Sequence, residues 1–199
     1  MLRRSLTALF AVILAAAALV GLQSPAGAGG DGGPGSIYDQ DSYDNKYEFE
    51  DEECGIGYVG RGRSKGFFTV YNAKGSDGQA FLIDDHYSYF EVLTNPANGR
   101  RMFISGHGRF RELKATRVEG NVFEFISVDA GTPLVVRDKR GRIVLKDHGK
   151  IVTKDTFDTL GDSQPGGEYL DSEVLSIKGH FPSYDPDFDF CALVSRLIG

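Results

Sequence analysis

The sequence predicts an all-β domain, either an antiparallel β-sandwich or a closed β-barrel of about eight to ten strands, with at most a short C-terminal helix. From Cys54 onward the chain is a succession of short runs rich in Val, Ile, Phe, Tyr and Thr, and most runs alternate apolar and polar residues with a period of two. Turn residues separate the runs, and helix signals are nearly absent. Both architectures share this pattern, so the sequence barely separates them.

Nine runs are predicted to be strands, and glycine turns at Gly99, Gly120 and Gly141 favour hairpins between antiparallel neighbours. The runs, in order, are "IGYVGRG", "FFTVYNA", "AFLIDDHYSYFEVLTN", "RRMFISGHGRFRELK", "NVFEFISVD", "PLVVRD", "RIVLKD", "KIVTKDTFDTL" and "EVLSIKGHF". The last segment, "FCALVSRLI", is long enough for about two helical turns. The polar stretch 161–173 is expected to be a long loop, and loops of that length often form the rim of a binding site.

The first 28 residues have the pattern of a secretory signal peptide. A basic start at Arg3 and Arg4 precedes an apolar run over 6–22, and Ala26 and Ala28 supply an A-x-A cleavage site. We therefore expect a secreted, extracellular protein that has no membrane anchor after cleavage.

Residues 29–53 are predicted to be an acidic disordered tail, and residues 54–199 a single β-domain. The stretch 29–53 holds nine acidic residues against one basic residue, whereas the rest of the chain to Gly199 holds nineteen of each. The stretch is rich in Gly and Asp and has no apolar period, so it lacks the surface whose burial would offset the entropy of ordering.

Two cysteines remain, Cys54 at the start of the predicted domain and Cys191 near its end. An even pair in an exported protein is expected to form a disulfide. This bond would join the two ends of the domain.

The stretch "FISGHGRFR", residues 103–111, contains one histidine between two glycines. Alternation places Gly106 and Gly108 on the apolar face of a strand, with His107, Arg109 and Arg111 on the other face. Inward glycines leave room for a neighbouring aromatic ring and allow the strand to coil, so a bend is favoured over a catalytic loop. The part "GHGRFR" is similar to the glycine-rich strand of dirigent-like barrels over these few residues, and this resemblance assigns no function.

Basic residues supply the candidate binding surface. They form a positive stripe if their strands are adjacent, and the stripe would bind an extracellular anionic polymer such as a polysaccharide, or the protein's own acidic tail. The alternative is an ordinary solvated strand face on which acids lie opposite the bases. Nucleic acid is not expected, because the mature chain is acidic overall. The stripe consists of Arg109, Arg111, Lys114, Lys146, Lys150 and Lys154.

No pattern indicates an enzyme, a metal or a cofactor. The chain has no G-x-S-x-G elbow, and its four histidines match no metal-ligand spacing. We therefore expect a non-enzymatic binding domain. One alternative is an extracellular, glycosidase-like hydrolase that uses two carboxylates from among Asp84, Asp85 and Glu91. Others are a structural envelope component, and a barrel in which Tyr87 and Tyr89 line a cavity for a small apolar ligand. The oligomeric state stays open.

Overall fold

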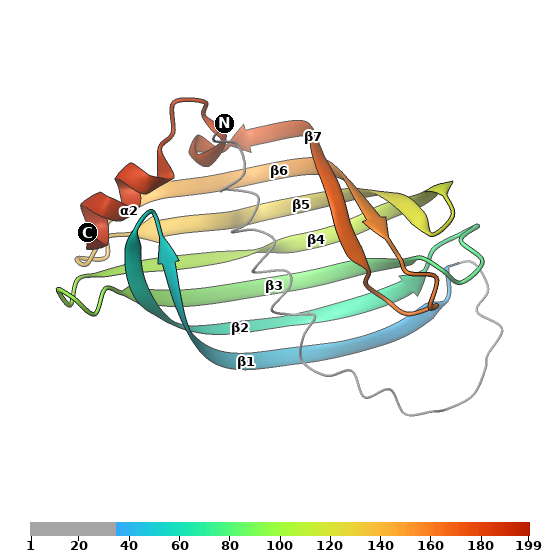
Figure 1. Cartoon of the computed structure of the whole chain (residues 1–199), viewed down its shortest axis with the longest axis horizontal. Helices are drawn as coiled ribbons and strands as arrows, with labels where there is room; N and C mark the ends of the chain where they lie inside the picture. Colours follow the sequence, from blue (N-terminus) through green and yellow to red (C-terminus); the bar gives the residue numbers. More distant parts are fainter. Residues whose placement is uncertain (1–34) are drawn as a thin grey trace. The chain divides into compact units, whose positions relative to one another are not determined.

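The computed structural model describes residues 35–199, which form one antiparallel sheet followed by a short helical segment (Figure 1). Each strand pairs with the next along the chain, so the strand order runs from β1 to β7. The elements are β1 (Ile37–Glu53), β2 (Ile56–Asn72), β3 (Phe81–Thr94), β4 (Arg101–Glu119), β5 (Val122–Arg137), β6 (Ile143–Asp158), β7 (Glu168–His180), the 3-10 helix η1 (Pro182–Tyr184) and helix α2 (Phe190–Ile198). The predicted all-β class, the antiparallel pairing and the short C-terminal helix are confirmed.

The sheet is open, because β1 and β7 are edge strands and do not pair with each other. The closed barrel is therefore wrong, and the strands are fewer and longer than predicted. The nine predicted runs combine into six strands, since β2, β5 and β6 continue through Gly66, Gly131 and Gly149. Gly131 and Gly149 have φ angles of 148° and 133°, which glycine adopts at little cost. The polar stretch 161–173 is a loop only in part, because β7 begins at Glu168.

The prediction of a disordered acidic tail is wrong for residues 37–53, which form β1, and the domain does not begin at Cys54. Strand β1 pairs with β2 along almost its whole length. Three of its aromatic residues lie on glycines of β2, and Tyr47, for example, covers Gly62. Two of its acids form ion pairs with bases of the same neighbour, as Glu48 does with Arg61. The predicted signal peptide and residues 29–34 lie outside the described residues.

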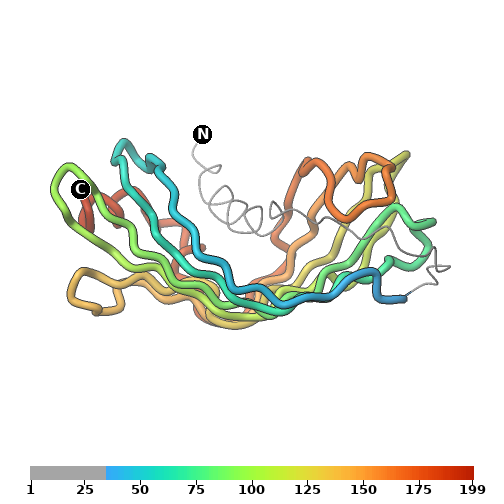
Figure 2. The backbone as a smooth tube through the Cα atoms, turned by 90° about the horizontal axis from the view of Figure 1, so that it is seen from below, coloured from blue at the N-terminus to red at the C-terminus, as the bar shows by residue number. Residues whose placement is uncertain are grey.

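A row of glycines crosses the middle of the sheet. Cross-strand register places Gly66 of β2 opposite Tyr87 of β3, and the row continues through Gly108, Gly131, Gly149 and Gly179 of β4 to β7. We call this row the glycine crease. Figure 2 shows that the sheet bends through its middle, so that both ends of the strands rise on the same side. We attribute the bend to the crease, because glycine permits the sharp coiling that residues with a Cβ resist.

The bend gives the sheet a concave face, which η1 and α2 approach (Figures 1 and 2). At one end of this face α2 is held to the β3–β4 turn, because the Asn95 side chain donates a hydrogen bond to the carbonyl oxygen of Ile198. The apolar side of α2 is buried at Leu193, Val194, Leu197 and Ile198. At the other end a separate cluster packs Phe123 and Phe125 against Ala73 and Ala80. Burial of apolar side chains is thus concentrated at the two raised ends.

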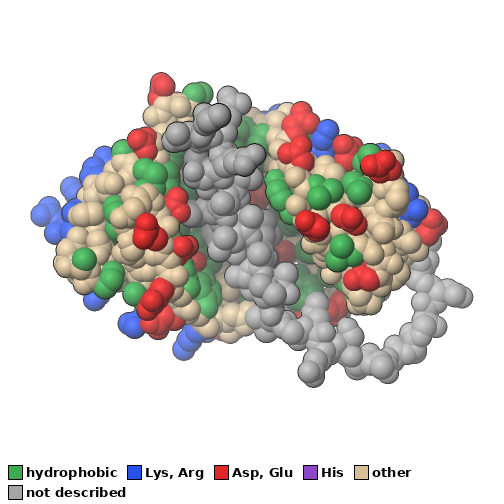
Figure 3. Space-filling model, viewed as in Figure 1, with side chains coloured by type: hydrophobic (Ala, Val, Ile, Leu, Met, Phe, Trp, Pro, Cys, Tyr) green, Lys and Arg blue, Asp and Glu red, His purple; other side chains and the backbone are tan. Residues whose placement is uncertain are grey.

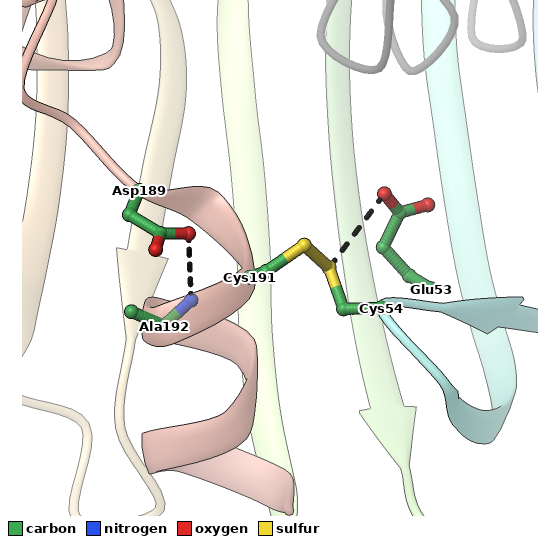
Figure 4. Close-up of a disulfide and its surroundings, with 5 residues drawn as sticks. All are labelled: Glu53, Cys54, Asp189, Cys191 and Ala192. Atoms are coloured by element: carbon green, nitrogen blue, oxygen red, sulfur yellow. Dashed lines mark hydrogen bonds between the residues drawn. A yellow bond between two sulfur atoms is a disulfide. The ribbon is translucent and has the colours of Figure 1, made fainter. Parts of the chain in front are cut away.

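The predicted disulfide between Cys54 and Cys191 is confirmed, with their Cα atoms 5.3 Å apart (Figure 4). It joins the β1–β2 hairpin to the first turn of α2. The side chain of Asp189 caps this helix by accepting a hydrogen bond from the backbone N–H of Ala192. The bond closes a loop of 137 residues, which in the chain-entropy model stabilises the fold by up to about 5 kcal/mol. No helix within residues 35–199 has both the length and the apolarity to cross a membrane.

Replacement of Gly108 by alanine is expected to destabilise the fold. A Cβ at this position would lie 2.8 Å from the carbonyl oxygen of Ala130 and 2.9 Å from the hydroxyl of Tyr87, so the backbone and a ring must both shift. We expect the free energy of unfolding in urea to fall by about 1–3 kcal/mol. Gly57→Ala is the matched control, because nothing lies within 4 Å of its added Cβ, and it should change stability by less than about 0.5 kcal/mol. Equal losses in the two variants would contradict the role of the crease.

Candidate functional site

The concave face is built from tyrosines that lie over glycines. Tyr87 and Tyr89 of β3 cover Gly108 and Gly106 of β4. This confirms the expectation that these inward glycines make room for neighbouring aromatic rings. Tyr43 and Tyr47 of β1 cover Gly66 and Gly62 of β2 in the same way. A ring that lies flat on the neighbouring strand carries its hydroxyl group as far as the strand beyond.

Three of these four hydroxyl groups donate hydrogen bonds to carboxylates. Tyr43 donates to Asp85 at 3.1 Å, Tyr47 donates to Glu91 at 2.7 Å, and Tyr87 donates to Asp129 at 3.0 Å. The hydroxyl of Tyr89 instead donates to the backbone carbonyl of Pro133 at 2.7 Å.

Burial raises the pKa of each of these three carboxyl groups, and that of Asp129 reaches about 6, with a contribution from the charge of Asp85. The three acids therefore anchor tyrosines within the sheet. Asp84, the third residue of the hydrolase hypothesis, lies on the opposite face, where Arg109 holds it. The structure thus separates Asp84 from Asp85 and Glu91.

The convex face carries a repeated tripeptide. Residues 107–109 are His-Gly-Arg, residues 148–150 are His-Gly-Lys, and residues 178–180 are Lys-Gly-His. Strands β4 and β6 run in the same direction and β7 runs oppositely, so the reversed order in β7 brings like residues to the same side of the crease. The glycine of each tripeptide belongs to the crease, and the residues before and after it are all exposed. Alternation along the strands places these exposed residues on the convex face.

Two rows result, which together we call the convex patch. The basic row contains Arg109, Lys150 and Lys178, with Ala130 of β5 between the first two. Lys150 and Lys178 lie directly opposite each other, and both side chains are exposed. Within residues 35–199 neither lysine forms an ion pair with an acid.

The histidine row contains His107, which lies opposite Thr132 of β5, and beyond it His148 and His180. The register of β5 with β6 shifts between Gly131 and Leu134, so Thr132 has no direct partner in β6. His148 and His180 are direct cross-strand partners, and their ring centroids are 6.1 Å apart. The fourth histidine of the chain, His86, lies beside Arg109 in the neighbouring strand. A shallow depression of the surface lies beside His86 and His107, and it is also lined by Lys65, Phe67 and Ser88.

The structure brings together part of the predicted basic stripe. Arg109 and Lys150 share the basic row, and Lys146 is exposed on the same strand as Lys150, on the way to the β5–β6 turn. Arg111 lies two residues beyond Arg109 on the same face of β4. Both guanidinium groups contact the carboxylate of Asp84, Arg109 at 2.6 Å and Arg111 at 3.3 Å.

The rest of the stripe lies apart from the basic row. Lys114 and Lys154 flank Ile126 of β5. Lys154 is held between Glu124 at 3.6 Å and Glu173 at 3.0 Å, as in the alternative of a solvated face with paired charges.

Sequence reasoning missed Lys178 and the alignment of the histidines. The available signal was the symmetry of "HGK" at 148–150 and "KGH" at 178–180, which pair residue for residue in an antiparallel hairpin. Figure 3 shows the concave side, where acidic and hydrophobic side chains gather on the raised ends and the Lys and Arg side chains lie mostly along the outline. Among residues 35–199 no group of three or more His, Cys, Asp or Glu side chains is arranged to hold a metal ion. Comparisons of the chain with protein-family models, curated proteins and solved structures give no match.

Replacement of Asp129 by asparagine tests the concave face through its pH dependence. The raised pKa means that the folded protein holds this proton more tightly than the unfolded chain does. Asp129 therefore lowers the stability of the fold as the pH rises from about 4 through about 6. An asparagine keeps an oxygen that can accept the hydrogen bond from the Tyr87 hydroxyl, and its amide group does not titrate. The stability of Asp129→Asn relative to wild type should rise by about 2 kcal/mol between about pH 4 and pH 7.

Urea unfolding at the two pH values measures this difference. Asp171→Asn, on the exposed part of β7, is the control and should show no comparable change. A variant at Asp129 whose stability follows that of the wild type at both pH values would show that this carboxyl is not withdrawn from water.

Proposed function

We propose that the chain is an exported, non-enzymatic domain that binds an extracellular anionic polymer through its convex patch. The observation that carries this proposal is the register of three tripeptides, which aligns Arg109, Lys150 and Lys178 in one row beside a row of histidines. The signal-peptide pattern of residues 1–28 and the disulfide support export.

The opposed lysines favour an anionic ligand on energetic grounds. Like charges placed directly opposite each other on neighbouring strands destabilise a sheet. Lys150 and Lys178 are such a pair, and within the described chain they lack the acidic neighbours that relieve Arg109 and Lys154. A sulfate, phosphate or carboxylate group between the two ammonium groups would remove this repulsion and gain attraction from both.

The dimensions of the patch favour a polymer over a single ion. Neighbouring strands lie about 4.8 Å apart, so the basic row extends for about 14 Å from β4 to β7. A chain with a charged group on each repeating unit can contact Arg109 and the two lysines at once. The surface has little depth, and binding would therefore be dominated by electrostatic attraction that weakens as salt is added.

The hydrolase alternative receives less support from the geometry. Asp85 and Glu91 are engaged by tyrosine hydroxyl groups, and Asp84 lies on the other face. We therefore place the ligand on the convex side and propose no reaction.

Retention on a dextran sulfate column tests the proposal. The double variant Lys150→Glu, Lys178→Glu should elute at a clearly lower salt concentration than the wild type, because it replaces two attractions by repulsions. The control is Lys74→Glu, Lys139→Glu, which makes the same change of net charge in the β2–β3 and β5–β6 turns. If both double variants elute together, retention reflects net charge alone and the convex patch is not the binding surface.

A further inference from the structure

We propose that His148 and His180 form a binding site for a divalent transition-metal ion such as Zn²⁺, Ni²⁺ or Cu²⁺. The two side chains come from β6 and β7 and lie directly opposite each other on the convex face. Both are exposed to solvent. They lie far apart in the sequence, so no linear metal motif connects them, and only the pairing of the two strands brings the rings together.

The geometry of the ring pair suits a shared metal ion. Imidazole nitrogens bind zinc at about 2.0–2.1 Å, and two rings on one tetrahedral ion then have centroids about 5 Å apart. The centroids of His148 and His180 are 6.1 Å apart, with an interplanar angle of 77°. Exposed histidines can close the remaining distance by rotation about their side-chain bonds, without any movement of the backbone.

The register of the neighbouring residues supports this pairing. Gly149 and Gly179 are also direct cross-strand partners, and so are Lys150 and Lys178. This continuous register brings His148 and His180 together on one side of the crease. The chemistry of the donors selects the metal, because neutral imidazole favours zinc, copper and nickel over calcium and magnesium.

The surroundings determine what completes the coordination. Two protein ligands leave positions for solvent or for an oxygen of an added ligand. Lys150 and Lys178 lie in the adjoining row and carry positive charge, which opposes a bare cation and favours an anionic third ligand. The site is thus suited to an ion that also contacts chloride, hydroxide or an acidic group of a bound polymer.

Calorimetric titration of the full chain with ZnCl₂ and with NiCl₂, in the absence of any polymer, tests the site. We expect saturable binding at about pH 7.5 that His148→Ala and His180→Ala each weaken by about tenfold or more, with no further loss in the double variant. The control is His86→Ala, an exposed histidine on the same face that lacks a histidine partner, and it should bind as the wild type does.

Two further measurements distinguish coordination by this histidine pair from nonspecific adsorption of the metal ion. Binding should weaken as the pH is lowered, because protons compete with the metal ion for the imidazole nitrogens. With Cu²⁺, electron paramagnetic resonance should show coupling to imidazole nitrogen that disappears in His148→Ala. Wild-type affinity in both alanine variants, or an equal loss in His86→Ala, would overturn the proposal and would leave the anion-binding function untouched.

Discussion

The shape of the sheet depends on the glycines of the crease. A residue with a Cβ at Gly108 would meet the carbonyl oxygen of Ala130 and the ring of Tyr87, so the sheet could not bend over these strands as it does. The bend produces a concave face for the tyrosines and a convex face for the basic residues. Alternation then links the two faces, because the residues on either side of an inward glycine must point outward. The crease and the convex patch are therefore two consequences of the same tripeptides.

The two faces differ in how their charges are satisfied. On the concave face Asp85, Glu91 and Asp129 accept hydrogen bonds from tyrosines that cross an intervening glycine strand. The pKa of each carboxyl group is raised because burial destabilises the charged form more than the tyrosine hydrogen bond stabilises it. On the convex face several bases are paired with acids across strands, whereas Lys150 and Lys178 face each other. A fold that tolerates such a pair keeps a local repulsion that an anion can relieve.

The acidic composition of residues 29–53 conceals the pattern of a strand. Within it, Tyr43, Tyr47 and Phe49 alternate with charged residues, which is the period of a strand with one covered face. What these rings cover is a line of glycines rather than a large apolar core, and glycine contributes nothing to a hydrophobic pattern. The acids between them find Arg61, Arg63 and Lys65 on β2. Along a free edge such charges also discourage pairing with other chains.

The sequence by itself determined the β class and the faces of β4, because the alternation of apolar and polar residues is a property of short segments. It also predicted the disulfide, because the chain has two cysteines that can pair. It identified Arg109 and Lys150 as candidates for the same surface, and it showed that Gly106 and Gly108 point inward. Only the tertiary structure decided that the sheet stays open and that the segments 107–109, 148–150 and 178–180 lie in register. That decision rests on the register between neighbouring strands, since a glycine can either end a strand or carry it through a bend, and only its pairing with the adjacent strand distinguishes the two.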